Sequence, residues 1–187
     1  QDNFFGKEGD DRTDADEITE AVFRAAMNSV QENKLEFIGN MIANIAIDSD
    51  IDATAAYLLI TNSESISYRS FCIIKFAHNV DQFEMASRPQ VGGDMIDVQL
   101  YSFSVEIFDL VRRGVIEMKD KAEDSDVYIG DIDPAKLRLT VFGVALYRVL
   151  SLEDIDNKSI LYVTVVNDML RLSRCKFGDS KFDTGTF

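Results

Sequence analysis

Two neighbouring stretches decide the fold: DLVRRGVIEMK at residues 109–119 and LRLTVFGVALYRVL at residues 137–150. In the first, a helix ends at Gly114, which suits the left-handed conformation that closes many helices, and an alternating strand follows. In the second, a returning strand leads to Thr140, a good N-cap for the next helix. The order of helix, strand, wing, strand and helix predicts the second half of a winged helix.

The same half of the chain, roughly residues 67–150, resembles the MarR-type transcription regulators. In that family a recognition helix runs into a glycine, a β-wing follows, and the pattern LT..G..L opens the next helix. Here that pattern is carried by Leu139, Thr140, Gly143 and Leu146. The resemblance implies a DNA-binding winged helix.

The helix expected at residues 99–113 departs from the family, because it is mostly apolar, carries Glu106 and Asp109, and has no basic residue before Arg112. A recognition helix needs Arg, Lys, Asn or Gln side chains aimed at base edges. The wing is acidic and would repel phosphates; its acidic residues are Glu123, Asp124, Asp126, Asp131 and Asp133. The basic residues around the wing that are available for nucleic acid are Arg112, Arg113, Lys119, Lys136 and Arg138. The sequence therefore favours a structural or protein-docking winged helix over one that binds DNA.

The charge balance also argues against DNA. The chain of 187 residues has 33 acidic and 19 basic residues, for a formal net charge of −14. Such a surface repels phosphate backbones and anionic membranes unless a local basic patch overrides it. With 46% apolar residues the chain can still bury a sizeable core, so we expect a folded domain.

The N-terminal part of the chain predicts helices on short connections. One long helix is expected from about residue 14 to residue 47, with Thr13 among its candidate N-caps and with Gly39 marking either a close helix crossing or a break. Asp52 is expected to cap the next helix, and Ser65 or Ser67 the one after it. The predicted fold is mainly α, with an N-terminal helical unit packed on a winged-helix-like half that carries a small β-wing. The predicted segments are a mobile leader (1–13), the helical unit (14–84), a loop (85–98), the winged-helix-like half with a C-terminal helix (99–175) and a mobile tail (176–187).

The stretch LEFIGNMIANIAI at residues 35–47 is apolar nearly all round. A helix of this kind is buried on several sides, which is more cover than a chain of this length readily offers. We therefore expect a homodimer, and Ile38, Ile42 and Ile45 are the candidate core or interface residues.

The residues that carry chemistry favour no enzyme. His78 is the single histidine, and Cys72 and Cys175 show no metal-ligand spacing, so we expect no metal and no cofactor. Cys72 lies in an apolar run and is predicted to be a buried hydrophobic residue. The stretch DSDIDA at residues 48–53 has Ala where a calcium loop needs Gly, so we expect a turn and a helix N-cap there. The triplet DTG at residues 183–185 is taken as a chance match to the aspartic-protease motif.

Three further stretches are DNFFG at residues 2–6, ENKLEFIGNMIANIAID at residues 32–48 and ISYRSFC at residues 66–72. Together they resemble an uncharacterised group of bacterial proteins, and the resemblance extends over most of the chain, with departures at Asn33 and Ser70. Longer members of the group carry an apolar segment upstream. The resemblance thus implies the soluble part of a longer, membrane-associated protein, which fits a chain that starts at Gln1.

The sequence therefore predicts a non-catalytic protein-interaction or sensor module, with a protein partner or a second copy as its partner. Cysteine usage without a disulfide pattern predicts a reducing cytoplasm. The alternative is a winged-helix transcription regulator. A third hypothesis, an effector domain of antiphage defence, comes from the look of the bacterial group alone.

Overall fold

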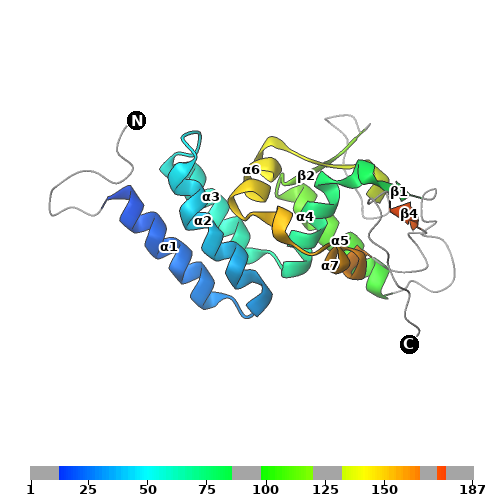
Figure 1. Cartoon of the computed structure of the whole chain (residues 1–187), viewed down its shortest axis with the longest axis horizontal. Coiled ribbons are helices and arrows are strands. Elements are labelled where there is room, and N and C mark those ends of the chain that lie inside the picture. Colours follow the sequence, from blue (N-terminus) through cyan, green and yellow to red (C-terminus); the bar gives the residue numbers. More distant parts are fainter. Residues whose placement is uncertain (1–12, 86–97, 120–131, 165–171, 176–187) are drawn as a thin grey trace.

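The computed structural model describes residues 13–85, 98–119, 132–164 and 172–175 (Figure 1). Within these ranges lie seven α-helices and two small antiparallel sheets, so the prediction of a mainly α fold is confirmed. Helices α1 to α3 gather at one end of the molecule, α6 lies against α2 and α3, and the β1–β4 sheet lies at the opposite end (Figure 1). The predicted leader up to residue 12, the tail from residue 176 and the wing tip at residues 120–131 lie outside the described residues.

The N-terminal unit contains α1 (Asp14–Asn28), α2 (Leu35–Ile47) and α3 (Ala53–Ser65). Thr13 caps α1 in a capping box with Asp16, so the cap is among the predicted candidates. The prediction of one continuous helix over residues 14–47 is wrong. The chain leaves the helical conformation at Ser29 and passes through a short 3-10 turn, Glu32–Lys34.

The break has a tertiary cause. It lets α2 turn back beside α1, so that Ile18 and Val22 of α1 share one core with Ile38 and Ile45 of α2. A straight helix would separate these apolar faces and leave both in water. Burying an apolar side chain contributes about 1.5–3 kcal/mol, so bringing the two apolar faces together favours the break.

Helix α4 (Tyr68–His78) is the centre of the molecule. The eight residues from Ser70 to Ala77 are all buried, and α4 contacts α5, α6 and α7. Asp52 caps α3 and Ser67 caps α4, as the sequence predicts. A 3-10 turn, Val80–Gln82, then leads into strand β1 (Phe83–Met85).

The segment that decides the fold has the predicted order of elements. Helix α5 (Val98–Arg112) is followed by β2 (Ile116–Met118), then a 3-10 turn (Pro134–Lys136), β3 (Leu137–Leu139) and α6 (Val141–Val149). Gly114 has φ +68°, and the bonds from Gly114 N to Val111 O and from Val115 N to Leu110 O close α5. Strands β2 and β3 pair antiparallel, and Thr140 caps α6. The identification of this arrangement as a winged helix stays a prediction.

The C-terminal part differs from the expectation. After a 3-10 turn, Leu152–Asp154, helix α7 (Asn157–Thr164) lies within the segment predicted to form the C-terminal helix. Leu172–Cys175, expected to continue a helix or a tail, instead forms β4, which pairs antiparallel with β1. The pairing joins Phe83 with Cys175. Four residues have no helical or strand period of their own, so only this long-range partner decides their conformation.

Candidate functional site

The acidic residue Glu106 of α5, one of the two that set this helix apart from a basic recognition helix, is partly buried and bonded to α4. Its carboxylate accepts hydrogen bonds from Ser67 Oγ at 3.1 Å and from Ser70 Oγ at 3.3 Å. It also pairs with Arg69 of α4, with 2.9 Å between the charged atoms. Arg69 donates as well to Ser102 Oγ at 3.1 Å. Glu106 therefore serves to hold α5 on α4.

Asp109 also has an internal partner, because its carboxylate pairs with Arg113 at 2.7 Å. The same guanidinium donates to Ser65 Oγ of α3 at 2.7 Å. Arg113 thus connects the end of α5 to the end of α3. Of the five basic residues predicted for nucleic acid, this one is engaged in holding the fold together.

The outward face of α5 carries two exposed apolar residues, followed one turn later by the half-exposed Asp109. Tyr101 is 51% exposed and Val105, one turn later, is 37% exposed. Phe103, Ile107 and Leu110 lie on the opposite face, buried in the core. Among the described residues, the first exposed basic side chain on α5 is Arg112, at the last position of the helix.

The other predicted basic residues gather at the base of the wing. Lys119 donates its backbone N–H to Lys136 O at 2.8 Å, and both side chains are exposed. Arg138 is exposed as well and stands directly opposite Glu117 across the β2–β3 pair. Of the predicted acidic wing residues, Asp133 accepts a bond from Ala135 N, and the others lie outside the described residues.

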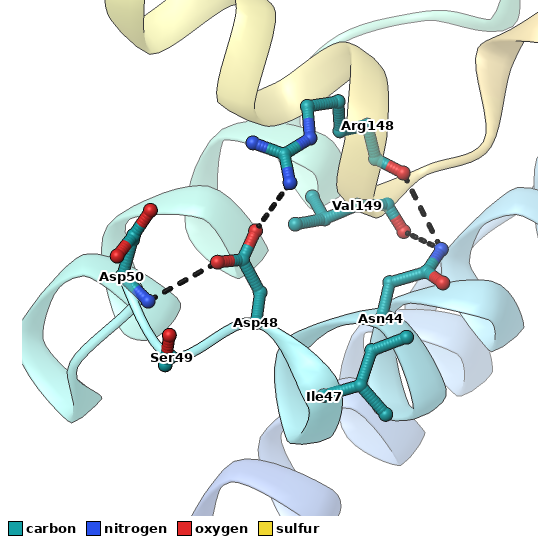
Figure 2. A pocket seen from close by; sticks show the side chains of 7 residues that line it. All are labelled: Asn44, Ile47, Asp48, Ser49, Asp50, Arg148 and Val149. Atoms are coloured by element: carbon teal, nitrogen blue, oxygen red, sulfur yellow. Dashed lines mark hydrogen bonds and ion pairs between the residues drawn. The ribbon is translucent and has the colours of Figure 1, made fainter.

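A hollow of about 390 Å³ separates the end of α2 from the end of α6 (Figure 2). Its lining residues are Asn44, Ile47, Asp48, Ser49, Asp50, Arg148 and Val149. The Arg148 guanidinium points across the hollow to Asp48, with 3.0 Å between the charged atoms. The other carboxylate oxygen of Asp48 accepts a bond from Asp50 N at 3.1 Å.

Asn44 joins the two halves of the molecule at this hollow. Its Nδ2 donates to Arg148 O at 3.3 Å, to Val149 O at 3.0 Å and to Ser151 Oγ at 2.9 Å. Carbonyls at the last turn of a helix have no partner within the helix, so Asn44 supplies one from another element. Ser151 itself has φ +53°, in the left-handed region. Asn44 and the Asp48–Arg148 pair thus connect the end of α2 to the end of α6 across the hollow.

The sequence did not predict this contact between Asn44 and the end of α6. The available signal was Asn44 itself, an amide inside the apolar run NMIANIAI. A polar side chain at such a position needs a hydrogen-bond partner inside the protein. The partners lie more than 100 residues away along the chain, so the sequence does not identify them.

Two buried lysines, Lys34 and Lys75, likewise donate hydrogen bonds to backbone carbonyls at the ends of helical turns. Lys34 donates to Glu64 O at 3.0 Å and to Ile66 O at 2.6 Å, at the end of α3. Lys75 donates to Glu153 O at 2.9 Å and to Ile155 O. Burial lowers the pKa of both lysines, and nearby carboxylates (Glu64 for Lys34) partly oppose that shift.

Cys72, His78 and the candidate isoleucines of α2 pack against other residues of the protein. Cys72 is fully buried, as predicted, and burial raises the pKa of its thiol to about 11, far from a reactive thiolate. His78 stacks on Tyr147, with 4.1 Å between the ring centroids. Ile38 and Ile45 lie in the core as predicted, and Ile42 is partly buried against it.

Comparison of the chain with protein-family models, with curated proteins and with solved structures finds no match. Across the described ranges, no helix combines the length and the apolar character that crossing a membrane requires. Those ranges also contain no group of three or more His, Cys, Asp or Glu side chains arranged to hold a metal ion.

Proposed function

We propose that this chain is a non-catalytic protein-interaction or sensor module, whose winged-helix-like half presents the outer face of α5 to a protein partner. The observation that carries the proposal is the composition of that face. Tyr101 and Val105 stand exposed where a DNA reader places basic or amide side chains. Exposed aromatic residues are enriched at protein interfaces, because they bury much apolar area and lose little rotamer freedom.

The pairing of Glu106 supports the same proposal. With Glu106 bound to Arg69, this acidic residue helps to hold α5 on α4 behind the face. Asp109, whose side chain is half exposed beside Val105, is paired with Arg113. A helix held rigidly from behind is a suitable platform for a partner, because little conformational freedom is lost on binding.

A DNA-binding transcription regulator is the second candidate function. The observation that favours it is the group of exposed cations Arg112, Lys119, Lys136 and Arg138 at the end of α5 and the base of the wing. The net charge of −14 opposes it, since phosphate contacts supply most of non-specific affinity for DNA.

The deciding experiment titrates the chain into labelled random-sequence duplex DNA and follows fluorescence anisotropy at low and then moderate salt. We expect no binding at tens of micromolar protein. Binding that weakens steeply with salt, and that is lost in Arg112→Ala with Lys136→Ala but kept in Lys158→Ala on α7, would establish the regulator and overturn the interaction module.

A second experiment identifies the partner face directly. A photo-cross-linking aromatic amino acid replaces Tyr101 in cells, and Lys158, exposed on α7, is the control position. We expect a cross-linked protein species from position 101 and none from position 158. Equal yields at both positions, or no species at position 101, would remove the support for α5 as the docking face.

A further inference from the structure

The hollow between the ends of α2 and α6 contains a guanidinium with unused hydrogen-bonding capacity (Figure 2). Arg148 uses one terminal nitrogen to pair with Asp48 at 3.0 Å. A guanidinium has several N–H donors in one plane, and among the residues that the structure describes this side chain makes no further hydrogen bond or ion pair. The side chain is 63% exposed, so its remaining donors are accessible to an anionic group.

A carboxylate with unused capacity belongs to the same hollow. Asp50 is exposed and bonds to Asp48 through its backbone N–H at 3.1 Å. Within the described ranges, the carboxylate of Asp50 has no hydrogen bond and no ion pair. In Figure 2 the Arg148 guanidinium and the Asp50 carboxylate lie on either side of the Asp48 carboxylate. The hollow therefore offers a positive donor and a negative acceptor at the same time.

Asp48 keeps these two groups in place. Its side chain is only 14% exposed, and one of its carboxylate oxygens pairs with Arg148. The other oxygen accepts the bond from Asp50 N. Polar groups that the fold already holds in position lose little conformational freedom when a ligand binds. Asp48 thus orients both groups and is itself fully occupied.

The dimensions of the hollow limit the size of the ligand. Its volume of about 390 Å³ is near the lower end of the range for small-molecule sites, about 300–1,000 Å³. Ile47, which is 81% exposed, adds an apolar edge beside the polar groups, and Ser49 adds a hydroxyl. These features favour a small molecule with both charges and a short apolar part.

We propose that the hollow binds a free amino acid, whose carboxylate accepts hydrogen bonds from Arg148 and whose ammonium donates to Asp50. Hydrogen bonds between ionised groups are about twice as strong as neutral ones. A ligand with one charge is less suitable, because the net charge of −14 opposes a lone anion and the nearby Arg148 opposes a lone cation. This inference rests on the proposed sensor module and supplies its ligand, at a site separate from the outer face of α5.

The position of the site is suitable for a sensor. Asp48 and Asp50 lie between α2 and α3, whereas Arg148 lies in the last turn of α6, so the ligand joins segments that are far apart in the sequence. Helix α6 is packed through Gly143 on the backbone of Val115, just after α5. A ligand held between α6 and the N-terminal unit therefore acts on the helix that supports the end of α5. It also stabilises the folded chain, because the unfolded chain lacks the site.

The test measures the Tm of the whole chain with each of the twenty free L-amino acids at about 5 mM, followed by isothermal titration calorimetry. We expect at least one amino acid to raise Tm. Its N-acetyl form lacks the ammonium and its methyl ester lacks the free carboxylate, so both should bind at least tenfold more weakly. Asp50→Asn and Arg148→Gln should each raise Kd at least tenfold. Asp50→Asn should keep the fold intact, because that carboxylate has no partner among the described residues. Asp81→Asn is the matched control, an exposed carboxylate in the Val80–Gln82 turn.

The absence of any Tm shift and of any binding heat up to about 10 mM amino acid overturns the site. Equal binding of the methyl ester or of the N-acetyl form overturns the recognition of a zwitterion, since one charge is then enough. Binding that Asp50→Asn leaves unchanged, or that Asp81→Asn weakens equally, overturns the assignment to this hollow. The proposed function fails by other results: a negative cross-link at position 101 or salt-sensitive DNA binding overturns the α5 proposal and leaves an amino-acid site in place.

Discussion

Replacing Gly143 by Ala tests how closely α6 is packed on the backbone of Val115, the residue before β2. A Cβ at this position would lie 3.1 Å from the carbonyl carbon of Val115, inside 3.0 Å of its oxygen, and 3.4 Å from Leu139 Cβ. The obstacle is backbone, so α6 itself must move away. That movement breaks the bond from Thr140 N to Val115 O, now 3.2 Å long.

The magnitude follows from three contributions. Overpacking of a filled site costs about 1–3 kcal/mol. A buried carbonyl that loses its partner costs about 1–3 kcal/mol more. The higher helix propensity of alanine than of glycine offsets about 1 kcal/mol of this loss. The net loss of unfolding free energy is about 3 kcal/mol, which for a chain of this size lowers Tm by about 6–12 °C.

Gly39→Ala is the control, because position 39 is in a helix and has open space around it. It should gain about 0.5–1 kcal/mol. Both variants are unfolded in urea at sub-micromolar concentration, where self-association is negligible, and followed by far-ultraviolet circular dichroism. Gly143→Ala with the stability of the natural chain would refute the close packing of α6 on Val115.

The remaining predictions concern buried groups. The raised pKa of Cys72 stabilises the fold fully below pH 9, the ordinary value for a thiol, and this contribution is lost as pH rises toward about 11. Chemical denaturation across that window should show a shallower loss of stability in Cys72→Ala than in the natural chain, and parallel curves would contradict the shift. Asn44→Ala, measured by urea denaturation, should cost about 1–3 kcal/mol because the carbonyls at the end of α6 lose their donor; a change below about 0.5 kcal/mol would refute the contact between Asn44 and the end of α6. Ile38→Ala should cost about 2–5 kcal/mol and the partly buried Ile42→Ala clearly less, and equal losses would contradict the burial assigned to them.

The sequence by itself determined the features that depend on residues three or four positions apart. Asp52 and Ser67 begin helices with their own side chains, and Gly114 ends one with a left-handed φ. The periodic apolar residues Ile38 and Ile45 identify a buried helix face. These features need only local hydrogen bonds or one helical period, so a short stretch of sequence is enough to predict them.

The tertiary structure alone decided the rest. The break at Ser29 appears because two apolar faces must meet, and the sequence around it shows only a weak interruption. Strand β4 exists through its pairing with β1, nearly 90 positions earlier. Glu106 faces Arg69, and Asn44 faces the end of α6, since long-range packing brings those partners within hydrogen-bond distance. The local sequence indicates which residues need a hydrogen-bond or pairing partner, and the packing of the whole chain decides which residue becomes that partner.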